Sequence, residues 1–421
     1  MEYLVKDLGS YKLHLIKTTK FKTIRAKVFF NAPIKKEEIT IRNFLGAILY
    51  LTNQKYKTKR SLTIKCQDLY ACDIGYRMSR FGNYSNFSFS MNALEDRFTE
   101  KGNLEKCFEL LSDIIYKPNI ENNEFDETYF NIVKHNAIVN INSIKESPSN
   151  YSIIRLLENM DKDSPLSYRP NGYIEDLEKI NRSNLYEYYQ KVLTKDIMDI
   201  FVIGNIDFKE IEKLVRKSFP PKVFKKIVIP CRLDEKKART KVQTIKEEND
   251  TNQSKLAIGC RLNDLTEHER NYALTIYTII LGGGSNSKLF QEVREKNSLA
   301  YYINSTVNKL DNILLIRAGI SKENFKEVVE LTKEQIKQMK KGKITEEEID
   351  NAKQMYLSSI DEIEESEDDI IDSYYMMDLL GVDDIETKKK EMVKVTKKEV
   401  VAVSKKVNMD TVYLLEGVKL W

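Results

Sequence analysis

Glycine and proline are both scarce in this chain of 421 residues, which contains 15 glycines and 8 prolines. These counts are about half the usual shares, so collagen-like and low-complexity chains are excluded. Because few residues interrupt regular structure, we expect long helices and strands. Hydrophobic residues make up 41% of the chain and charged residues 31%, which is enough for a core and a solvated surface. At roughly 100–200 residues per domain, the length predicts two or three domains.

Histidine is also scarce, since the chain has only His14, His135 and His268, which lie far apart. A zinc site on one helix needs two histidines four residues apart, and neither H-x-x-E-H nor H-x-x-x-H occurs. We expect His14 to lie at the surface or at a sheet edge, and His268 to be solvated at a helix start. His135 alone cannot hold a metal ion, so the sequence predicts no metal site in this chain.

Cysteine is sparse and forms no C-x-x-C pair; the five residues are Cys66, Cys72, Cys107, Cys231 and Cys260. Such a scattered, odd set is typical of reduced thiols in a cytoplasmic protein. The start of the chain, MEYLVKDLGSYKLHL, has no basic stretch followed by an apolar one, so we expect no signal peptide. The longest apolar run, near Leu274–Leu281, is far shorter than the roughly 20 residues of a membrane span. We therefore expect a cytoplasmic protein without a membrane span.

The charges are nearly balanced, with 68 basic and 64 acidic residues and a net charge of +4. Nucleic-acid-binding proteins concentrate Lys and Arg on one face or tail, whereas both signs are interspersed here, so we expect no nucleic-acid partner. The acidic stretch at residues 361–372 lacks the spacing and the central glycine of a calcium loop. A solvated helix end is the expected role of that stretch.

Signatures of nucleophilic and nucleotide-binding enzymes are missing as well. No G-x-S-x-G occurs, and no cysteine lies in a recognisable catalytic setting. The segment Gly282, Gly283, Gly284 and Ser285 precedes a predicted helix, but it lacks the G-K-[ST] ending of a phosphate loop. A flexible connection between helices is the simplest explanation. Three consecutive glycines in a glycine-poor chain still indicate a close backbone approach, by another helix or by a peptide.

The same order of predicted elements occurs twice along the chain. Each half begins with a strand, continues with two helices and a hairpin, and ends with helices and a closing strand. In the first half these are strand 24–30, helices 38–52 and 61–71, hairpin strands 75–81 and 87–91 around Gly82-Asn83, and strand 197–203. In the second half they are strand 254–260, a helix from Thr266, helix 285–297, hairpin strands 301–307 and 313–319, helix 322–340, a helix from Thr345 and strand 409–417.

A seam at residues 219–250 separates the halves and holds three of the eight prolines followed by a charged stretch. We expect residues 220–250 to be a linker between a first domain, residues 1–219, and a second domain, residues 251–421. Each is predicted to be an α+β domain in which helices pack on a mainly antiparallel sheet.

The second half contains GGGSNSKLFQEVREKNSLAYYINSTV, a glycine-rich loop followed by S-x-L-F-x-x-x-R-E and then L-A-Y. This segment resembles the insulinase-like (pitrilysin-type) zinc peptidases. In the first half, SPLSYRPNGYIEDLEKINRSNLYEYYQKVL and DIFVIGNIDFKEIEKLVRKSF are similar to the family's pattern around its G-N-x-D strand end. The resemblance spans nearly the full chain and implies two homologous domains that form a clamshell.

The resemblance breaks down at the family's zinc site. Active members carry H-x-x-E-H on the helix after the first strand and a further Glu downstream. Placed without gaps, the matching stretch RNFLGAILYLT has Arg42, Leu45 and Gly46 at the His, Glu and His positions. A shift of a few residues brings in no histidine, and Asn and Ile dominate where the downstream Glu would lie. The chain therefore resembles a member that has lost the zinc site.

The retained segment includes Arg294 and Tyr301. In related peptidases such a pair lies in the half that faces the zinc half, where it contacts the peptide carbonyl and helps to stabilise the oxyanion. A guanidinium donates readily to carbonyls, and a phenol O–H aimed at an oxyanion lowers the barrier. The resemblance thus implies that Arg294 and Tyr301 are accessory catalytic residues at a partner's site, and that Gly282 to Ser285 bind substrate. Without it, a surface arginine and a half-buried strand tyrosine would be the simpler interpretation.

The leading hypothesis is a non-catalytic, substrate-binding subunit of a heterodimeric insulinase-like metallopeptidase. A paralogous partner would carry the zinc, so no cofactor is expected in this chain, and a peptide would be the substrate. A homodimer in the absence of that partner is also compatible with the sequence. The alternative is an inactive scaffold or interaction subunit with no role in peptide cleavage. Loss of the zinc ligands fits both hypotheses, whereas retention of Arg294 and Tyr301 favours the first.

Overall fold

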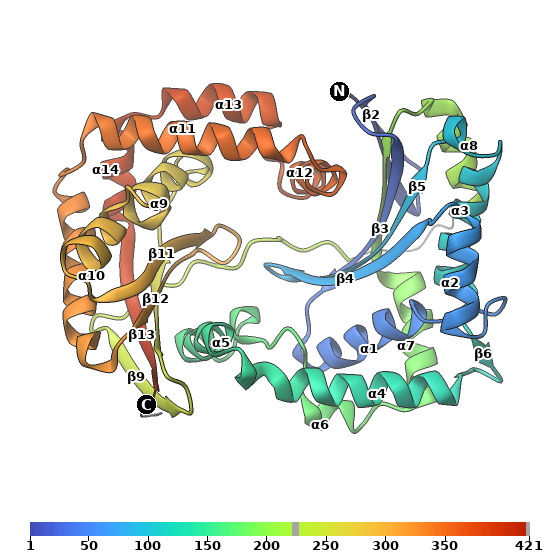
Figure 1. The fold of residues 1–421 in the computed structure, drawn as a ribbon, viewed down its shortest axis with the longest axis horizontal. Coiled ribbons are helices and arrows are strands. Elements are labelled where there is room, and N and C mark those ends of the chain that lie inside the picture. Colours follow the sequence, from blue (N-terminus) through green and yellow to red (C-terminus); the bar gives the residue numbers. More distant parts are fainter. Residues whose placement is uncertain (221–226, 418–421) are drawn as a thin grey trace. The chain divides into compact units, whose positions relative to one another are not determined.

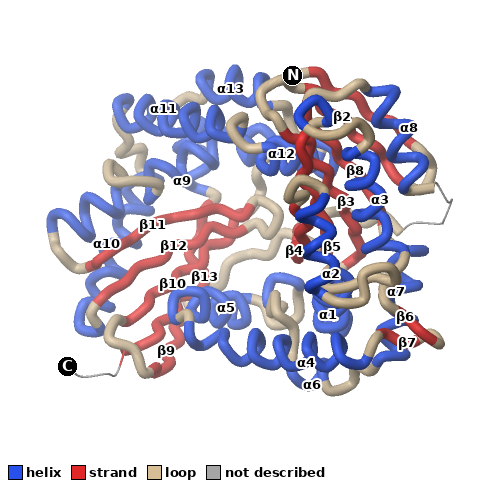
Figure 2. Tube along the Cα trace, turned by 45° about the vertical axis from the view of Figure 1, so that its right-hand side comes forward, coloured by secondary structure: helices blue, strands red, loops and turns tan. Residues whose placement is uncertain are grey.

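The computed structural model describes residues 1–220 and 227–417, which form two compact units. Unit 1 comprises Met1–Asn142, Arg169–Pro230 and Ser366–Asp372, and unit 2 comprises Ser143–Tyr168, Cys231–Glu365 and Ser373–Trp421. Each unit contains one main sheet whose strands are mostly antiparallel and are covered by helices (Figures 1 and 2). The predicted α+β class with two sheet-containing halves is confirmed. In the described part of the chain, no helix combines the length and the apolar character that crossing a membrane requires.

Unit 1 is built on a six-stranded sheet in the order β1-β2-β8-β3-β5-β4. β2 runs parallel to β8, and the other neighbours are antiparallel. The strands are β1 Glu2–Asp7, β2 Tyr11–Lys17, β3 Thr23–Pro33, β4 Asp73–Phe81, β5 Tyr84–Leu94 and β8 Ile197–Gly204, with a small hairpin of β6 Ile120–Glu121 and β7 Glu124–Phe125. The helices are α1 Ile39–Leu49, α2 Lys59–Asp68, α3 Asn103–Tyr116, α4 Glu127–Asn142, α6 Ile174–Leu177, α7 Arg182–Lys195 and α8 Phe208–Ser218.

Unit 2 is built on a five-stranded sheet in the order β11-β12-β10-β13-β9. Helices α9, α10 and α14 cover one face of this sheet and α5 covers the other (Figure 1). The strands are β9 Gln243–Asn249, β10 Ser254–Leu262, β11 Ala300–Asn308, β12 Ile313–Ile320 and β13 Val407–Gly417. The helices are α5 Pro148–Met160, α9 Leu274–Gly282, α10 Phe325–Lys340, α11 Glu346–Ile363, α13 Ile385–Lys394 and α14 Lys397–Lys405, while α12 Glu367–Leu380 has residues in both units.

The internal repeat predicted from the sequence is present in the strand order. The sheets share the orders β2-β8-β3-β5-β4 and β9-β13-β10-β12-β11, in which the closing strand β8 or β13 lies beside β3 or β10, and the hairpin follows. In both sheets the strand on the other side of the closing strand, β2 or β9, runs parallel to it. The repeat therefore includes one strand, β2 or β9, that the sequence patterns did not reveal.

Several local predictions are confirmed by the described residues. The first hairpin turns at Gly82-Asn83, where Gly82 has φ +54°. The helices predicted to start at Thr266 and Thr345 begin with reciprocal hydrogen bonds to Glu269 and Glu348. Capping boxes also begin α7 at Asn181 and α14 at Thr396. Each cap satisfies backbone N–H groups that a helix start would otherwise leave without a partner.

The seam expected to be a linker contains β9, which pairs with β13 along its whole length. Its sequence, QTIKEEN, is charged on one side because β9 is an edge strand with alternate residues exposed. Residues 221–226 of the expected linker lie outside the described residues.

Helix α5 precedes the seam in sequence but belongs to unit 2. Its apolar residues Leu156 and Met160 pack with Ala257 and Tyr413 on the sheet. Gly259 leaves room for this contact, since a Cβ there would lie 2.2 Å from the Met160 sulfur. Which sheet this helix covers was not apparent from its local sequence.

The acidic stretch at residues 361–372 differs from the solvated helix end that we expected. Its second part belongs to unit 1, where Glu367 accepts a hydrogen bond from Thr23 at 2.9 Å. Asp368 lies 2.6 Å from both Arg25 and Lys27 on β3. The basic residues on β3 provide the partners, and these are distant in sequence and not apparent from the acidic stretch itself.

Candidate functional site

Helix α1 lies where the resemblance places the zinc-binding helix. It follows β3 and packs its apolar face on the sheet and on α4, where Phe44 contacts the ring of Phe130. Arg42 lies on the buried side of α1 and is 1% exposed. Its guanidinium donates to the Asp196 carboxylate at 2.5 Å and to the Phe30 carbonyl at 2.9 Å.

The Arg42–Asp196 pair is an ion pair inside unit 1. Asp196 is the residue that follows α7, and its side chain is 3% exposed. The guanidinium also lies over the Phe87 ring, 4.7 Å from its centre. Burial opposes the charge of Arg42, but the neighbouring Asp196 carboxylate outweighs it and raises the pKa of Arg42. A buried pair of this kind joins α1 to the end of α7 and to the sheet.

The burial pattern of α1 indicates that the family's zinc motif aligns with this helix one residue later than in the gapless alignment. A catalytic zinc needs ligands that face an open coordination position, whereas Arg42 and Leu45 face the interior at 1% and 0% exposure. Asn43 and Ala47 are partly exposed, and with Gly46 they share the i, i+3, i+4 spacing of the motif. In neither placement do the side chains supply a histidine or a carboxylate, so these residues do not fit zinc.

His14 was predicted to lie at the surface or at a sheet edge, and this is wrong. It is 0% exposed, because β1 pairs outside β2 and covers it. Its ring stacks on Phe201 at 3.9 Å, and its Nδ1 lies 2.7 Å from the Tyr3 hydroxyl. β1, which the sequence patterns did not indicate, forms the true edge. His268 is exposed as predicted and pairs with Glu399 at 3.1 Å.

Arg294 and Tyr301 both lie on unit 2. Arg294 is on the π-helix Phe290–Lys296, and its side chain is 43% exposed with its guanidinium 4.7 Å from the centre of the Phe290 ring. Tyr301 is 65% exposed near the start of β11. Two large side chains able to donate hydrogen bonds are thus presented to the outside of unit 2 by adjoining elements.

A β-bulge produces the exposure of Tyr301. Ala300 pairs with Ile320 and Tyr302 with Gly319, so Tyr301 is the extra residue. A bulge locally bends the strand and re-aims side chains. Tyr302 packs against Gly319 instead, and its hydroxyl lies 3.3 Å from that of Ser149 on α5. The different environments of Tyr301 and Tyr302 are therefore due to the bulge, and not to the alternation of side chains along a regular strand.

The glycine-rich segment is partly buried. A Cβ on Gly282 would lie 2.6 Å from the backbone nitrogen of Ser305, so α9 approaches β11 closely at this point. The close backbone approach expected here thus involves a strand of the same unit. Gly283 and Ser285 are exposed and Gly284 is half-buried next to Met355. Only the outer residues of this segment are open to a ligand in the described structure.

Sequence comparisons show a similarity to M16 peptidases. The family described as "Peptidase M16 inactive domain" matches residues 179–356. A "Probable inactive metalloprotease YmfF" of Bacillus subtilis is 28% identical over 413 residues, covering 97% of this chain and 96% of the relative. An "Uncharacterized zinc protease YmxG" of the same bacterium is 28% identical over 259 residues, 60% of each chain.

Structural comparisons agree with the sequence comparisons. A conserved protein from Enterococcus faecalis superimposes with a TM-score of 0.90 at 27% identity and covers 100% of this chain and 99% of its own. A protease from Helicobacter pylori has a TM-score of 0.81 at 16% identity, which shows a common fold, over 99% of both chains. The chain is thus similar over nearly its whole length to proteins of the insulinase-like, or M16, peptidase family, and it lacks their H-x-x-E-H motif.

Sequence reasoning missed the buried Arg42–Asp196 pair. The available signal was an arginine inside the apolar run ITIRNFLGAIL, which is unusual because arginine is rarely buried without a partner. The partner, 154 residues away, has no local signal.

Proposed function

We propose that this chain is the non-catalytic, substrate-binding subunit of a two-chain M16 metallopeptidase. Its partner would be a paralogue that carries the zinc ligands, and the two chains would close around a peptide. The observation that supports this proposal is a difference between the two units. The α1 positions of unit 1 cannot hold zinc, whereas unit 2 presents Arg294 and Tyr301 at its surface.

The comparisons support such a pairing indirectly. One bacterium has both a full-length relative described as a probable inactive metalloprotease and a second relative described as a zinc protease. Sequence similarity that extends over 97% of the chain despite the missing motif supports a role that depends on the whole fold. The proposed role places both proteins in the cytoplasm, in agreement with five cysteines that form no disulfide.

The chemistry of the proposed site follows from the two side chains. A tyrosine O–H directed at a developing oxyanion stabilises the transition state, and a guanidinium donates to peptide carbonyls in a fixed planar geometry. Arg294 stacks on Phe290, whereas the bulge in β11 exposes Tyr301. The edge strand β11 that carries Tyr301 also offers an unpaired backbone to an extended peptide.

The test begins by mixing the pure chain with a zinc-bearing paralogue encoded in the same genome. Size-exclusion chromatography should show a complex of about twice the monomer mass, and peptide hydrolysis should appear only in the mixture. If the paralogue is fully active alone and unchanged by this chain, the scaffold role replaces the proposed one.

Variants of the pair then test the residues in the assembled complex. Tyr301→Phe should lower turnover by roughly 10²–10³-fold, since it removes one oxyanion donor. Arg294→Lys keeps the charge but loses the planar fork, so it should also weaken peptide binding. Tyr302→Phe is the matched control, because its hydroxyl contacts Ser149 and it should change turnover little. Equal turnover of the wild type and Tyr301→Phe in equally assembled complexes would refute the assigned role.

A further inference from the structure

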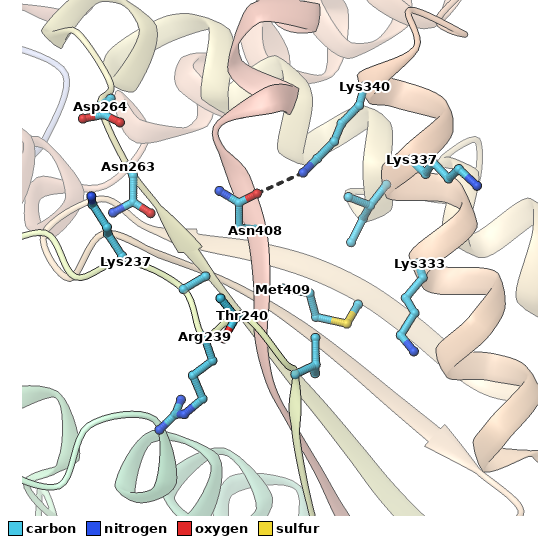
Figure 3. A pocket seen from close by; sticks show the side chains of 13 residues that line it. Lys237, Arg239, Thr240, Asn263, Asp264, Lys333, Lys337, Lys340, Asn408 and Met409 are labelled. Carbon is cyan, nitrogen blue, oxygen red and sulfur yellow. Dashed lines mark hydrogen bonds between the residues drawn. The ribbon is translucent and has the colours of Figure 1, made fainter.

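Unit 2 contains a cavity of about 660 Å³ that the proposed peptidase role does not use. Its walls are α10, the segment Lys237–Val242 and the start of β13 (Figure 3). Basic side chains gather around it, whereas Asp264 is the single carboxylate among the described residues that line it. The cavity is therefore open to a negatively charged ligand.

Lys340 is the central cation of this cavity. It extends from the end of α10 toward the first residues of β13, where its ammonium donates to the Asn408 side-chain oxygen at 3.1 Å (Figure 3). Within the described residues, the structure records no carboxylate partner for it. Burial lowers the pKa of Lys340, and the Cys260 thiol nearby is neutral because burial raises its pKa to about 12. An anion placed beside this ammonium would supply the missing countercharge.

Two further lysines on α10 extend the positive surface. Lys333, Lys337 and Lys340 follow the i, i+4, i+7 spacing that places side chains on one helix face. At 1.5 Å per residue they span roughly 10 Å along the helix. Lys333 pairs with Glu330 and Lys337 with Glu334 at the surface, and such exposed pairs are weak. The lysines can therefore turn to a ligand at small cost.

The opposite wall contributes Lys237, for which the described residues show no ion pair, and Arg239. Arg239 turns away from the cavity (Figure 3), because it donates to Asp410 and to the carbonyls of Asn159 and Met160. Arg239 therefore stabilises this wall and is not available to a ligand. The floor is apolar and consists of Val242, Ile336 and Met409.

We propose that this cavity binds a small ligand that carries an oligophosphate chain, of the size of a nucleoside triphosphate. Lysines act as point charges toward phosphate oxygens, and three lysines whose positions span roughly 10 Å along α10 suit an extended polyanion better than a single phosphate. The apolar floor would receive the uncharged part of the ligand. This inference is independent of the proposed peptidase role, since it involves neither Arg294 nor Tyr301.

The experiment is calorimetric titration of the full-length chain with orthophosphate, pyrophosphate and ATP at low ionic strength. Binding should strengthen from orthophosphate to pyrophosphate, and ATP should bind at least as tightly as pyrophosphate. Lys340→Met should weaken ATP binding about tenfold or more, the effect of losing one charge-assisted bond. Lys337→Met, at a more exposed position, should have a smaller effect and serves if Lys340→Met fails to fold.

Lys326→Met is the matched control, because Lys326 is an exposed lysine on the same helix that does not line the cavity. It removes the same charge and should change the affinity less than twofold. The proposal is overturned if the wild type binds neither pyrophosphate nor ATP at millimolar concentration. It is also overturned if pyrophosphate binds no more tightly than orthophosphate, or if Lys326→Met weakens binding as much as Lys340→Met.

Discussion

Removal of Arg42 should destabilise unit 1 strongly, because it leaves the Asp196 carboxylate buried without its partner. Asp196 has a side chain that is only 3% exposed, and the Phe30 carbonyl would lose its guanidinium donor as well. Breaking a buried ion pair on one side typically costs about 3–5 kcal/mol. We expect this loss for Arg42→Met, which keeps a long side chain and removes the charge.

The expected loss converts into a measurable shift of the melting temperature. Unit 1 contains roughly 200 residues, and at about 2.1 cal/mol/K per residue its unfolding entropy predicts a decrease of about 7–12 °C. Scanning calorimetry with circular dichroism would detect this shift in the transition of unit 1. The double variant Arg42→Met/Asp196→Leu should recover most of the stability, because a buried pair replaced by apolar groups is often neutral.

The pH dependence provides a second check on the same variant. Burial raises the pKa of Asp196, and the attraction of Arg42 only partly offsets this rise. Without Arg42 the folded state favours the protonated carboxyl, so stability falls as pH rises through the unfolded pKa. The deficit of Arg42→Met should therefore be larger at pH 8 than at pH 5. A decrease of less than about 2 °C in the melting temperature of Arg42→Met would refute the reasoning. So would a double variant whose loss of stability equals the sum of the losses of the two single variants.

Three further predictions follow from other parts of the molecule. The dialysed protein should retain no stoichiometric zinc in metal analysis, because neither placement on α1 supplies ligands; one tightly held zinc per chain with chelator-sensitive peptidase activity would contradict this. Gly282→Ala should cost about 1–3 kcal/mol of unfolding free energy, since its Cβ would meet the Ser305 backbone at 2.6 Å, whereas the exposed Ser285→Ala should be neutral in the same urea titration. Burial lowers the pKa of Lys309 to about 8, so the free energy of unfolding should rise with pH between about 8 and 10, where the unfolded state retains the proton. Lys309→Met should flatten that rise. An unchanged pH profile of stability in this variant would contradict the prediction.

The positions of most elements could be predicted because they depend on local patterns. The sequence predicted a helix over residues 322–340, and α10 lies there with these apolar residues buried at helical spacing: Phe325, Val328, Val329, Ile336 and Met339. Caps such as Thr345 and the turn at Gly82-Asn83 depend on residues within three positions of each other. Local hydrogen bonding of this kind is encoded in short stretches of sequence.

What could not be predicted depends on contacts between distant segments. The burial of His14 results from β1 pairing outside β2, and the placement of α5 results from space above Gly259. The bulge at Tyr301 follows from the pairing of β11 with β12 and has no signal in YYINSTV itself. The sequence therefore identified the segments of the candidate site, whereas the orientation of their side chains required the structure. The roles of Arg294, Tyr301 and the glycine-rich segment stay predictions, as do the domain boundaries.

The return of residues 366–372 to unit 1 has a consequence for biosynthesis. While the chain is being made, β3 emerges early with Arg25 and Lys27 facing a position that Asp368 and Asp372 fill only much later. At about 5–20 residues per second, roughly 7–28 s pass between synthesis of residue 230 and arrival of these carboxylates. During that interval the nascent first sheet carries uncompensated positive charge on a surface destined to be covered. Chaperone recruitment to the ribosome-bound chain should therefore persist until this late segment has left the exit tunnel.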